Sequence, residues 1–183
     1  MLGDWPTANS SGTFVPRAGL SLKELNTAQR SAALALVSSA LSRKGFEKVE
    51  QIMEGDEVLK IEGNKPIFGK DLYYISIPGK PSEKDPWMLQ FGGHHLALNI
   101  TIAGERGVLT PTLTGAQPAL YTSNGKTVRP LGQEGDKTLA LLNALDETSK
   151  ETGISELQAS RSCARARTGR QDDPARGFEG FTK

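Results

Sequence analysis

The segment from Trp87 to Ile102 constrains the fold of this 183-residue chain most. It is rich in apolar and β-branched residues, and it holds both histidines of the protein, His94 and His95, directly after the pair Gly92-Gly93. Such a composition predicts a β-strand. Because histidine is the side chain best suited to proton transfer or metal ligation near neutral pH, any imidazole chemistry of this protein lies in this segment.

Side chains alternate between the two faces of a regular strand. On this pattern His94 shares a face with Leu96, which predicts a buried histidine, whereas His95 shares the polar face with Asn99. Two adjacent histidines on a regular strand cannot both ligate one metal ion, although a bulge at Gly92-Gly93 would re-aim the pair. We favour a structural role for His94, and we weigh structural and functional roles for His95 evenly.

Helical periodicity of the apolar residues predicts three helices. The first covers residues 28–42 and is rich in Ala and Leu, which are good helix formers. The second is short, covers residues 46–56 and ends at Gly55-Asp56. The third covers residues 134–146.

Strand-like pieces predict a small sheet over residues 57–128. Residues 58–61 and 73–77 form two of its strands. Residues 108–113 form a hairpin partner for the histidine segment, and Pro111 places that partner at an edge or a bulge. Together these elements predict an α+β fold with N-terminal helices, a mainly antiparallel sheet, one closing helix and a disordered C-terminal tail.

The composition changes along the chain and suggests three parts. Residues 1–19 form an irregular leader, residues 20–160 a single α+β domain, and residues 161–183 a tail. The tail lacks Leu, Ile, Val and Met and holds half of the arginines, which predicts disorder. A nucleic-acid-binding arm is one alternative. We prefer the hypothesis that the tail is out of frame, because codons chosen for Ser162 to Gly180, read one nucleotide later, give LVLGPGQDGKTIQPEGLK.

Charge and hydropathy exclude some partners. The formal net charge of +1 argues against a general affinity for nucleic acid or anionic lipid. No apolar run approaches the roughly 20 residues that span a bilayer. We therefore expect neither a nucleic-acid partner nor a membrane partner. The N-terminus does not resemble a signal peptide, so the default location is cytoplasmic; it becomes secreted or periplasmic if an N-terminal extension is missing.

The histidine segment supports two functional hypotheses. The first is a hydrolase of small esters or lactones, in which His95 activates water as a general base or as the ligand of a divalent metal ion. Asn99 would orient His95 or donate to an oxyanion. Glu134 would orient His95 or, with His94 and His95, ligate the metal. The second hypothesis is a non-catalytic binding or interaction module, in which the histidines tie strands together through buried hydrogen bonds.

Short motifs spread along the chain point to one family. The most specific is Gly93-His94-His95-Leu96, followed by Asn99. The others are Pro16-Arg17-Ala18-Gly19-Leu20, Leu41-Ser42, Gly45-Phe46, Pro86-Trp87, Thr110-Pro111-Thr112, Gly115-Ala116 and Pro118. Together they resemble a bacterial family catalogued as domain of unknown function 3500. The resemblance covers roughly residues 4–160, and the frame-shifted tail looks like its continuation.

The resemblance implies no particular activity. It implies that family members continue into a C-terminal region with a further His-x-His element and an Arg-Asp pair, which this chain lacks. We therefore expect a chain that is truncated relative to the family and carries half of any site shared between the two regions. Apolar surface left exposed by the truncation would favour a homo-oligomer.

Overall fold

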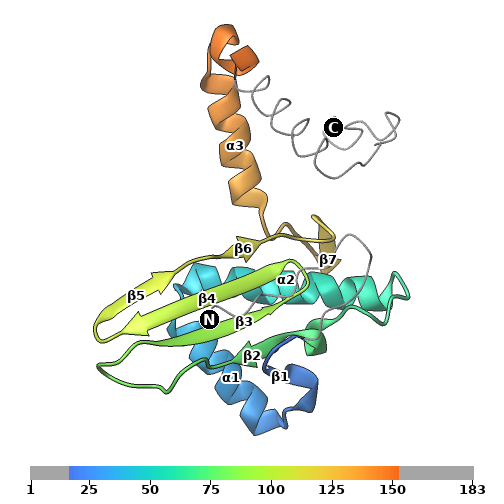
Figure 1. The fold of residues 1–183 in the computed structure, drawn as a ribbon. Helices are drawn as coiled ribbons and strands as arrows, with labels where there is room; N and C mark the ends of the chain where they lie inside the picture. Colours follow the sequence, from blue (N-terminus) through green and yellow to red (C-terminus); the bar gives the residue numbers. More distant parts are fainter. Residues whose placement is uncertain (1–16, 153–183) are drawn as a thin grey trace, which may run out of the picture. The chain divides into compact units, whose positions relative to one another are not determined.

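The computed structural model describes residues 17–152, and the predictions for residues 1–16 and for the tail 161–183 lie outside the described residues. The chain divides into two compact units with a boundary between Gly132 and Gln133, and the single domain predicted over residues 20–160 spans this boundary. In the first unit, helices pack against a mainly antiparallel sheet, which confirms the predicted α+β class (Figure 1). No helix within the described residues is long and apolar enough to cross a membrane.

The main sheet belongs to the first unit and is antiparallel throughout, in the order β1-β2-β3-β4-β5, with β6 also paired to β4. Its strands are β1 (Leu20–Ser21), β2 (Tyr74–Ser76), β3 (Trp87–Gly93), β4 (Leu96–Ala103), β5 (Arg106–Leu109) and β6 (Leu113–Thr114). A second, two-stranded sheet pairs β7 (Tyr121–Ser123) with β8 (Lys126–Val128). The predicted hairpin between β4 and β5 is present, and Pro111 separates β5 from β6, because proline cannot donate to a strand ladder.

The single strand predicted over residues 87–102 is wrong. The segment forms two strands, β3 and β4, joined by a two-residue turn at His94 and His95, with Gly93 paired to Leu96. His95 has a φ of 59°. This left-handed conformation is uncommon for residues other than glycine, and it ends the extended backbone of the strand.

Helices α1 (Thr27–Ser39) and α2 (Arg43–Ile61) pack against one face of the sheet (Figure 1). Asn26 and Gln29 form a capping box at the start of α1, and the Ser42 side chain caps α2. The buried core between the helices and the sheet is apolar. It consists of Leu22, Val37, Val49, Ile52, Met53, Tyr73, Phe91, Leu96 and Leu98. These contacts orient α2 relative to the turn that carries the histidines.

Two predictions for the α2 region are wrong. The helix does not end at Gly55-Asp56, and residues 58–61 are its last turn rather than a strand. Gly55 and Asp56 are buried inside the helix because both face other parts of the fold. A Cβ on Gly55 would lie 3.5 Å from the Tyr121 ring, and the Asp56 carboxylate contacts His94. These tertiary contacts outweigh the weak local preference of Gly and Asp to end a helix.

Helix α3 (Gly132–Ala144) lies in the second unit except for its first residue, and it confirms the helix predicted over residues 134–146. Three of its leucines, Leu139, Leu141 and Leu142, are exposed.

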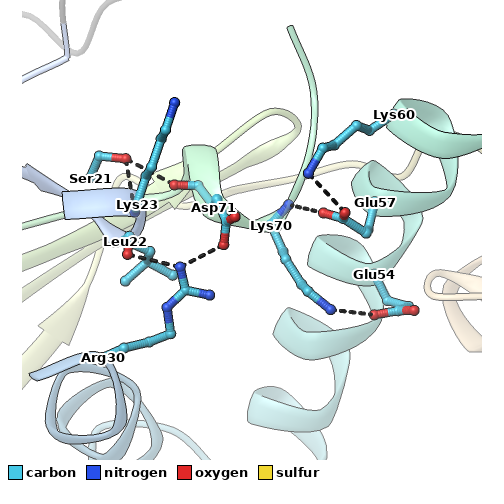
Figure 2. Close-up of polar contacts among 9 residues, drawn as sticks. All are labelled: Ser21, Leu22, Lys23, Arg30, Glu54, Glu57, Lys60, Lys70 and Asp71. Atoms are coloured by element: carbon cyan, nitrogen blue, oxygen red, sulfur yellow. Dashed lines mark hydrogen bonds and ion pairs between the residues drawn. The ribbon is translucent and has the colours of Figure 1, made fainter. Parts of the chain in front are cut away.

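A short 3-10 turn, η2 (Lys70–Leu72), leads into the buried Tyr73, and polar contacts hold it between the two helices (Figure 2). The Arg30 guanidinium on α1 donates to the Asp71 carboxylate and to the Leu22 carbonyl. On the other side, the Glu57 carboxylate on α2 accepts a bond of 3.0 Å from the Lys70 backbone amide. The position of the backbone just before Tyr73 is therefore fixed by both helices.

Replacing Asp71 with Asn removes the charge opposite Arg30 and lowers the free energy of unfolding by about 0.5–1 kcal/mol near neutral pH, the range of partly exposed ion pairs. The hydrogen bond from Arg30 lowers the pKa of the Asp71 carboxyl below its usual value. The Arg30–Asp71 pair therefore stabilises the fold fully above the pKa that Asp71 has in the unfolded chain. This stabilisation is lost as the pH falls through the pKa that Asp71 has in the folded chain. Urea unfolding of both proteins, near neutral pH and near pH 3, measures the effect.

The matched control is Asp85→Asn, because the Asp85 carboxylate is exposed and accepts its bond from the Ser82 hydroxyl rather than from a cation. This change should stay within about 0.5 kcal/mol at both pH values. If the loss in the Asp71 variant did not shrink at the lower pH, the Arg30–Asp71 charge pair would not be its cause.

Candidate functional site

The two histidines lie side by side at the tip of the β3–β4 hairpin. Their ring centroids are 3.9 Å apart. The expectation that they point to opposite faces is wrong, because residues of a tight turn are not part of the strand pleat. The hairpin thus brings together two imidazoles that a continuous strand would separate.

His94 is bonded to a buried carboxylate. Its Nδ1 lies 2.7 Å from Oδ1 of Asp56 on α2, and Asp56 is 2% exposed. Because a carboxylate accepts hydrogen bonds, the Nδ1 of a neutral His94 imidazole donates to Asp56 and the lone pair of that tautomer lies on Nε2. The Phe68 ring packs against the imidazole with centroids 4.4 Å apart. The His94 side chain is 26% exposed, and its Nε2 makes no hydrogen bond to the described part of the chain.

Tyr73 supports the turn from the core side. Its hydroxyl donates to the His94 carbonyl at 2.9 Å, and its ring lies against Gly93, where a Cβ would come within 2.7 Å of the ring. Burial, with a smaller effect from the charge and hydrogen bond of Asp56, raises the pKa of Tyr73 far above its ordinary value. The hydroxyl therefore stays protonated and remains a donor to the turn.

His95 is held by the segment that follows β6. Its Nε2 donates to the side-chain oxygen of Gln117 at 3.1 Å, and its carbonyl accepts a bond of 2.6 Å from the Gly115 amide. A Cβ on Gly115 would lie 3.0 Å from Nδ1 of the His95 ring, so glycine at this position leaves room for the imidazole. The Nε2 atom of His95 is thus already bonded within the fold, unlike that of His94.

Asn99 is bonded to other residues of the sheet region, and Glu134 belongs to the second unit. Asn99 lies four residues beyond His95, which is about 13 Å in an extended strand. Its amide nitrogen donates to the Pro111 carbonyl at 2.7 Å, and its oxygen accepts from Gln90 at 2.8 Å. Glu134 lies in the first turn of α3 in the second unit, and the structure does not place the two units relative to each other.

The metal set of His94, His95 and Glu134 stays a prediction. Among the described residues no group of three or more His, Cys, Asp and Glu side chains could hold a metal ion. One nitrogen of each histidine is already engaged, by Asp56 and by Gln117. The arrangement within the first unit is instead a carboxylate–imidazole pair with one free basic nitrogen.

Sequence reasoning missed Asp56, Tyr73 and Arg17. The sequence could have indicated Asp56, because it follows Val49, Ile52 and Met53 at the spacing of one helix face. A carboxylate on an apolar helix face needs a polar partner. The Tyr73 position had no such signal. Nor did Arg17, whose Nη1 is buried without a hydrogen-bond partner among the described residues.

Comparison with known families agrees with the motifs. The family model described as "Protein of unknown function (DUF3500)" matches residues 4–181. The chain belongs to this family. The match confirms the resemblance seen in the Gly93–Leu96 motif and its companions. No curated protein and no solved structure matches the chain. The family description assigns no activity.

Replacing Gly93 with Ala should lower the free energy of unfolding by about 1–3 kcal/mol, because the added methyl group overlaps the buried Tyr73 ring. The control is Gly107→Ala on β5, where a Cβ meets only the Thr101 carbonyl oxygen, at 3.9 Å. It should change stability by no more than about 0.5 kcal/mol. Denaturant unfolding compares the two variants, and equal effects would show that the Tyr73–Gly93 contact is not close-packed.

Proposed function

We propose that this protein is a hydrolase of small esters or lactones in which His94 is the general base and Asp56 orients it. The observation that carries the proposal is the 2.7 Å contact between Nδ1 of His94 and the buried Asp56 carboxylate. A buried carboxylate behind an imidazole fixes its tautomer and stabilises the imidazolium that forms during proton transfer. The partly exposed His94 ring supports access of water to Nε2.

The proposed reaction needs only a water molecule besides the substrate. Nε2 of His94 takes a proton from water as the water oxygen bonds to the acyl carbon. The carbonyl oxygen becomes an oxyanion, the acyl carbon–oxygen bond then breaks, and the imidazolium returns the proton to the departing alkoxide. The products are a carboxylic acid and an alcohol, or one hydroxy acid when the substrate is a lactone.

The choice of His94 as base differs from the sequence-based hypothesis, which centred the reaction on His95. His95 donates from Nε2 to Gln117 and lacks a carboxylate partner within the described residues. We assign His95 the role of a positioning residue, because its ring packs beside that of His94 and its left-handed backbone forms the turn.

The variant His94→Gln should lower kcat by about 10²–10⁴, the usual contribution of a general base, and Asp56→Asn should lower it within the same range. The assay is hydrolysis of p-nitrophenyl acetate and δ-valerolactone by the purified chain, with and without a chelator. Circular dichroism checks that each variant is folded. Turnover that is lost with the chelator would add a metal ion to the mechanism.

The matched control is His95→Asn, because asparagine tolerates the left-handed backbone of this turn. It should lower kcat far less than His94→Gln does, because His95 positions the turn and takes no proton. A fully active His94→Gln variant beside an inactive His95→Asn variant would overturn the assignment and return the base role to His95.

A non-catalytic binding or interaction module is the second hypothesis. The observation that favours it is the same Asp56–His94 contact, because it also fastens α2 to the β3–β4 turn. On this reading Asp56→Asn lowers the free energy of unfolding by about 1–3 kcal/mol through poorly satisfied buried groups, and the folded wild-type chain turns over none of the esters or lactones.

A further inference from the structure

Tyr73 is fully buried on the core side of the histidine turn and contacts the turn in two ways. Its hydroxyl donates to the His94 carbonyl at 2.9 Å, and its ring occupies the space beside Gly93 that a Cβ would need. The ring also stacks on Phe91, with centroids 5.9 Å apart, so close packing restricts the movement of the hydroxyl. Tyr73 therefore holds the backbone of the turn at the residue that carries the proposed base.

The backbone just before Tyr73 is held by two helices. In η2, the Asp71 carboxylate accepts a bond from the Arg30 guanidinium on α1. The Lys70 amide donates to the Glu57 carboxylate on α2 (Figure 2). The position of the Tyr73 side chain is therefore set by the helices, and the histidine turn is bonded to that side chain.

The contact between His94 and Asp56 depends on the position of the turn. Nδ1 of His94 lies 2.7 Å from Oδ1 of Asp56, and a hydrogen bond weakens steeply when its geometry departs from the optimum. The carboxylate belongs to α2, whereas the imidazole is attached to a two-residue turn between β3 and β4. The contact therefore persists only while the turn keeps its place relative to the helix.

We propose that Tyr73 is a positioning residue for the His94 base. The inference rests on the proposed function, in which Nε2 of His94 takes a proton from water. Without the hydroxyl, the His94 carbonyl loses a buried bond, and the turn reorients to satisfy that carbonyl, which moves the imidazole away from Asp56. A displacement of about 1 Å at a reacting group costs up to roughly a hundredfold in rate. Because Tyr73 is buried and does not reach the substrate, the loss falls on kcat rather than on KM.

Tyr73→Phe tests the inference, because it removes the hydroxyl and keeps the ring beside Gly93. The matched control is Tyr121→Phe, which removes another buried hydroxyl, one that donates to the Gln51 carbonyl on α2 at 2.7 Å. Both variants lose a bond from a tyrosine hydroxyl to a backbone carbonyl, so a loss of stability alone would affect both. Only Tyr73→Phe removes a bond to the histidine turn.

The first readout needs no turnover. Long-range proton–nitrogen NMR spectra of the full chain with isotope-labelled histidine report which ring nitrogen carries the proton, and His94→Gln assigns the His94 signals. Neutral His94, observed at alkaline pH, should be in the Nδ1–H form in the wild type and in Tyr121→Phe. Tyr73→Phe should shift a measurable share of it to the Nε2–H form. An unchanged tautomer in Tyr73→Phe, an equal change in Tyr121→Phe, or a wild type in the Nε2–H form would each overturn the proposal.

The second readout is hydrolysis of p-nitrophenyl acetate. Tyr73→Phe should lower kcat about tenfold to hundredfold and change KM by less than about twofold, whereas Tyr121→Phe should keep kcat within about twofold of the wild type. A changed tautomer without a loss of kcat would show that Tyr73 does not position the base for the reaction. A wild type that hydrolyses no ester would remove the hydrolase, and the tautomer measurement alone would then support or overturn Tyr73 as the residue that positions His94.

If Tyr73→Phe does not fold, the hydroxyl proton of the wild type decides. A buried and bonded hydroxyl exchanges slowly with water, so Tyr73 should give its own proton signal. Tyr121→Phe removes the corresponding signal of Tyr121 and thereby assigns the one that remains. The absence of a separate Tyr73 signal would show that its bond to the turn is not maintained and would overturn the proposal.

Discussion

The hydrogen bond between Asp56 and His94 is the interaction on which the rest of the structure depends. It joins the middle of α2 to the tip of the β3–β4 hairpin, two elements far apart in the sequence. A carboxylate that is 2% exposed is stable in a protein interior only with good partners. His94 is such a partner because the hairpin turns at that residue, and the turn is supported from the core side by Tyr73. The position of α2 and the position of the β3–β4 turn therefore depend on each other.

Local rules predicted the parts of the fold that local interactions decide. The Ala- and Leu-rich first helix and the β4–β5 hairpin depend on neighbours in sequence, and the structure has both of them. The end of α2 depends on distant residues. Gly-Asp reads locally as a helix stop, but here the glycine makes room for Tyr121 and the aspartate reaches His94. Both contacts join residues that are far apart in the sequence, so a rule based on neighbouring residues cannot detect them.

The hairpin turn could have been predicted from a change in the alternation of apolar residues. Leu89 and Phe91 are odd-numbered apolar positions, whereas Leu96 and Leu98 are even-numbered, and all four are buried. A strand cannot change the phase of its apolar face without a bulge or a turn. A two-residue turn shifts the phase in this way, and the register of β3 with β4 pairs Phe91 with Leu98 on one face. The turn lacks the usual Asn-Gly or Asp-Gly signal, so the phase change was the available clue.

Hydrogen-bond satisfaction separates the structural polar residues of this fold from those that suit a ligand. The amide of Asn99 is bonded at both ends, to Pro111 and to Gln90, which explains a buried polar residue in mid-strand without a ligand. Within residues 17–152, His94 has one bonded and one free nitrogen, and Arg17 has a buried nitrogen without a hydrogen-bond partner. Asn99 was predicted to be a site residue because the sequence does not reveal which polar atoms the fold itself satisfies. His94 is bonded to the buried Asp56 carboxylate through Nδ1, and for that reason the functional hypothesis moves from the strand face to the junction of α2 with the histidine turn.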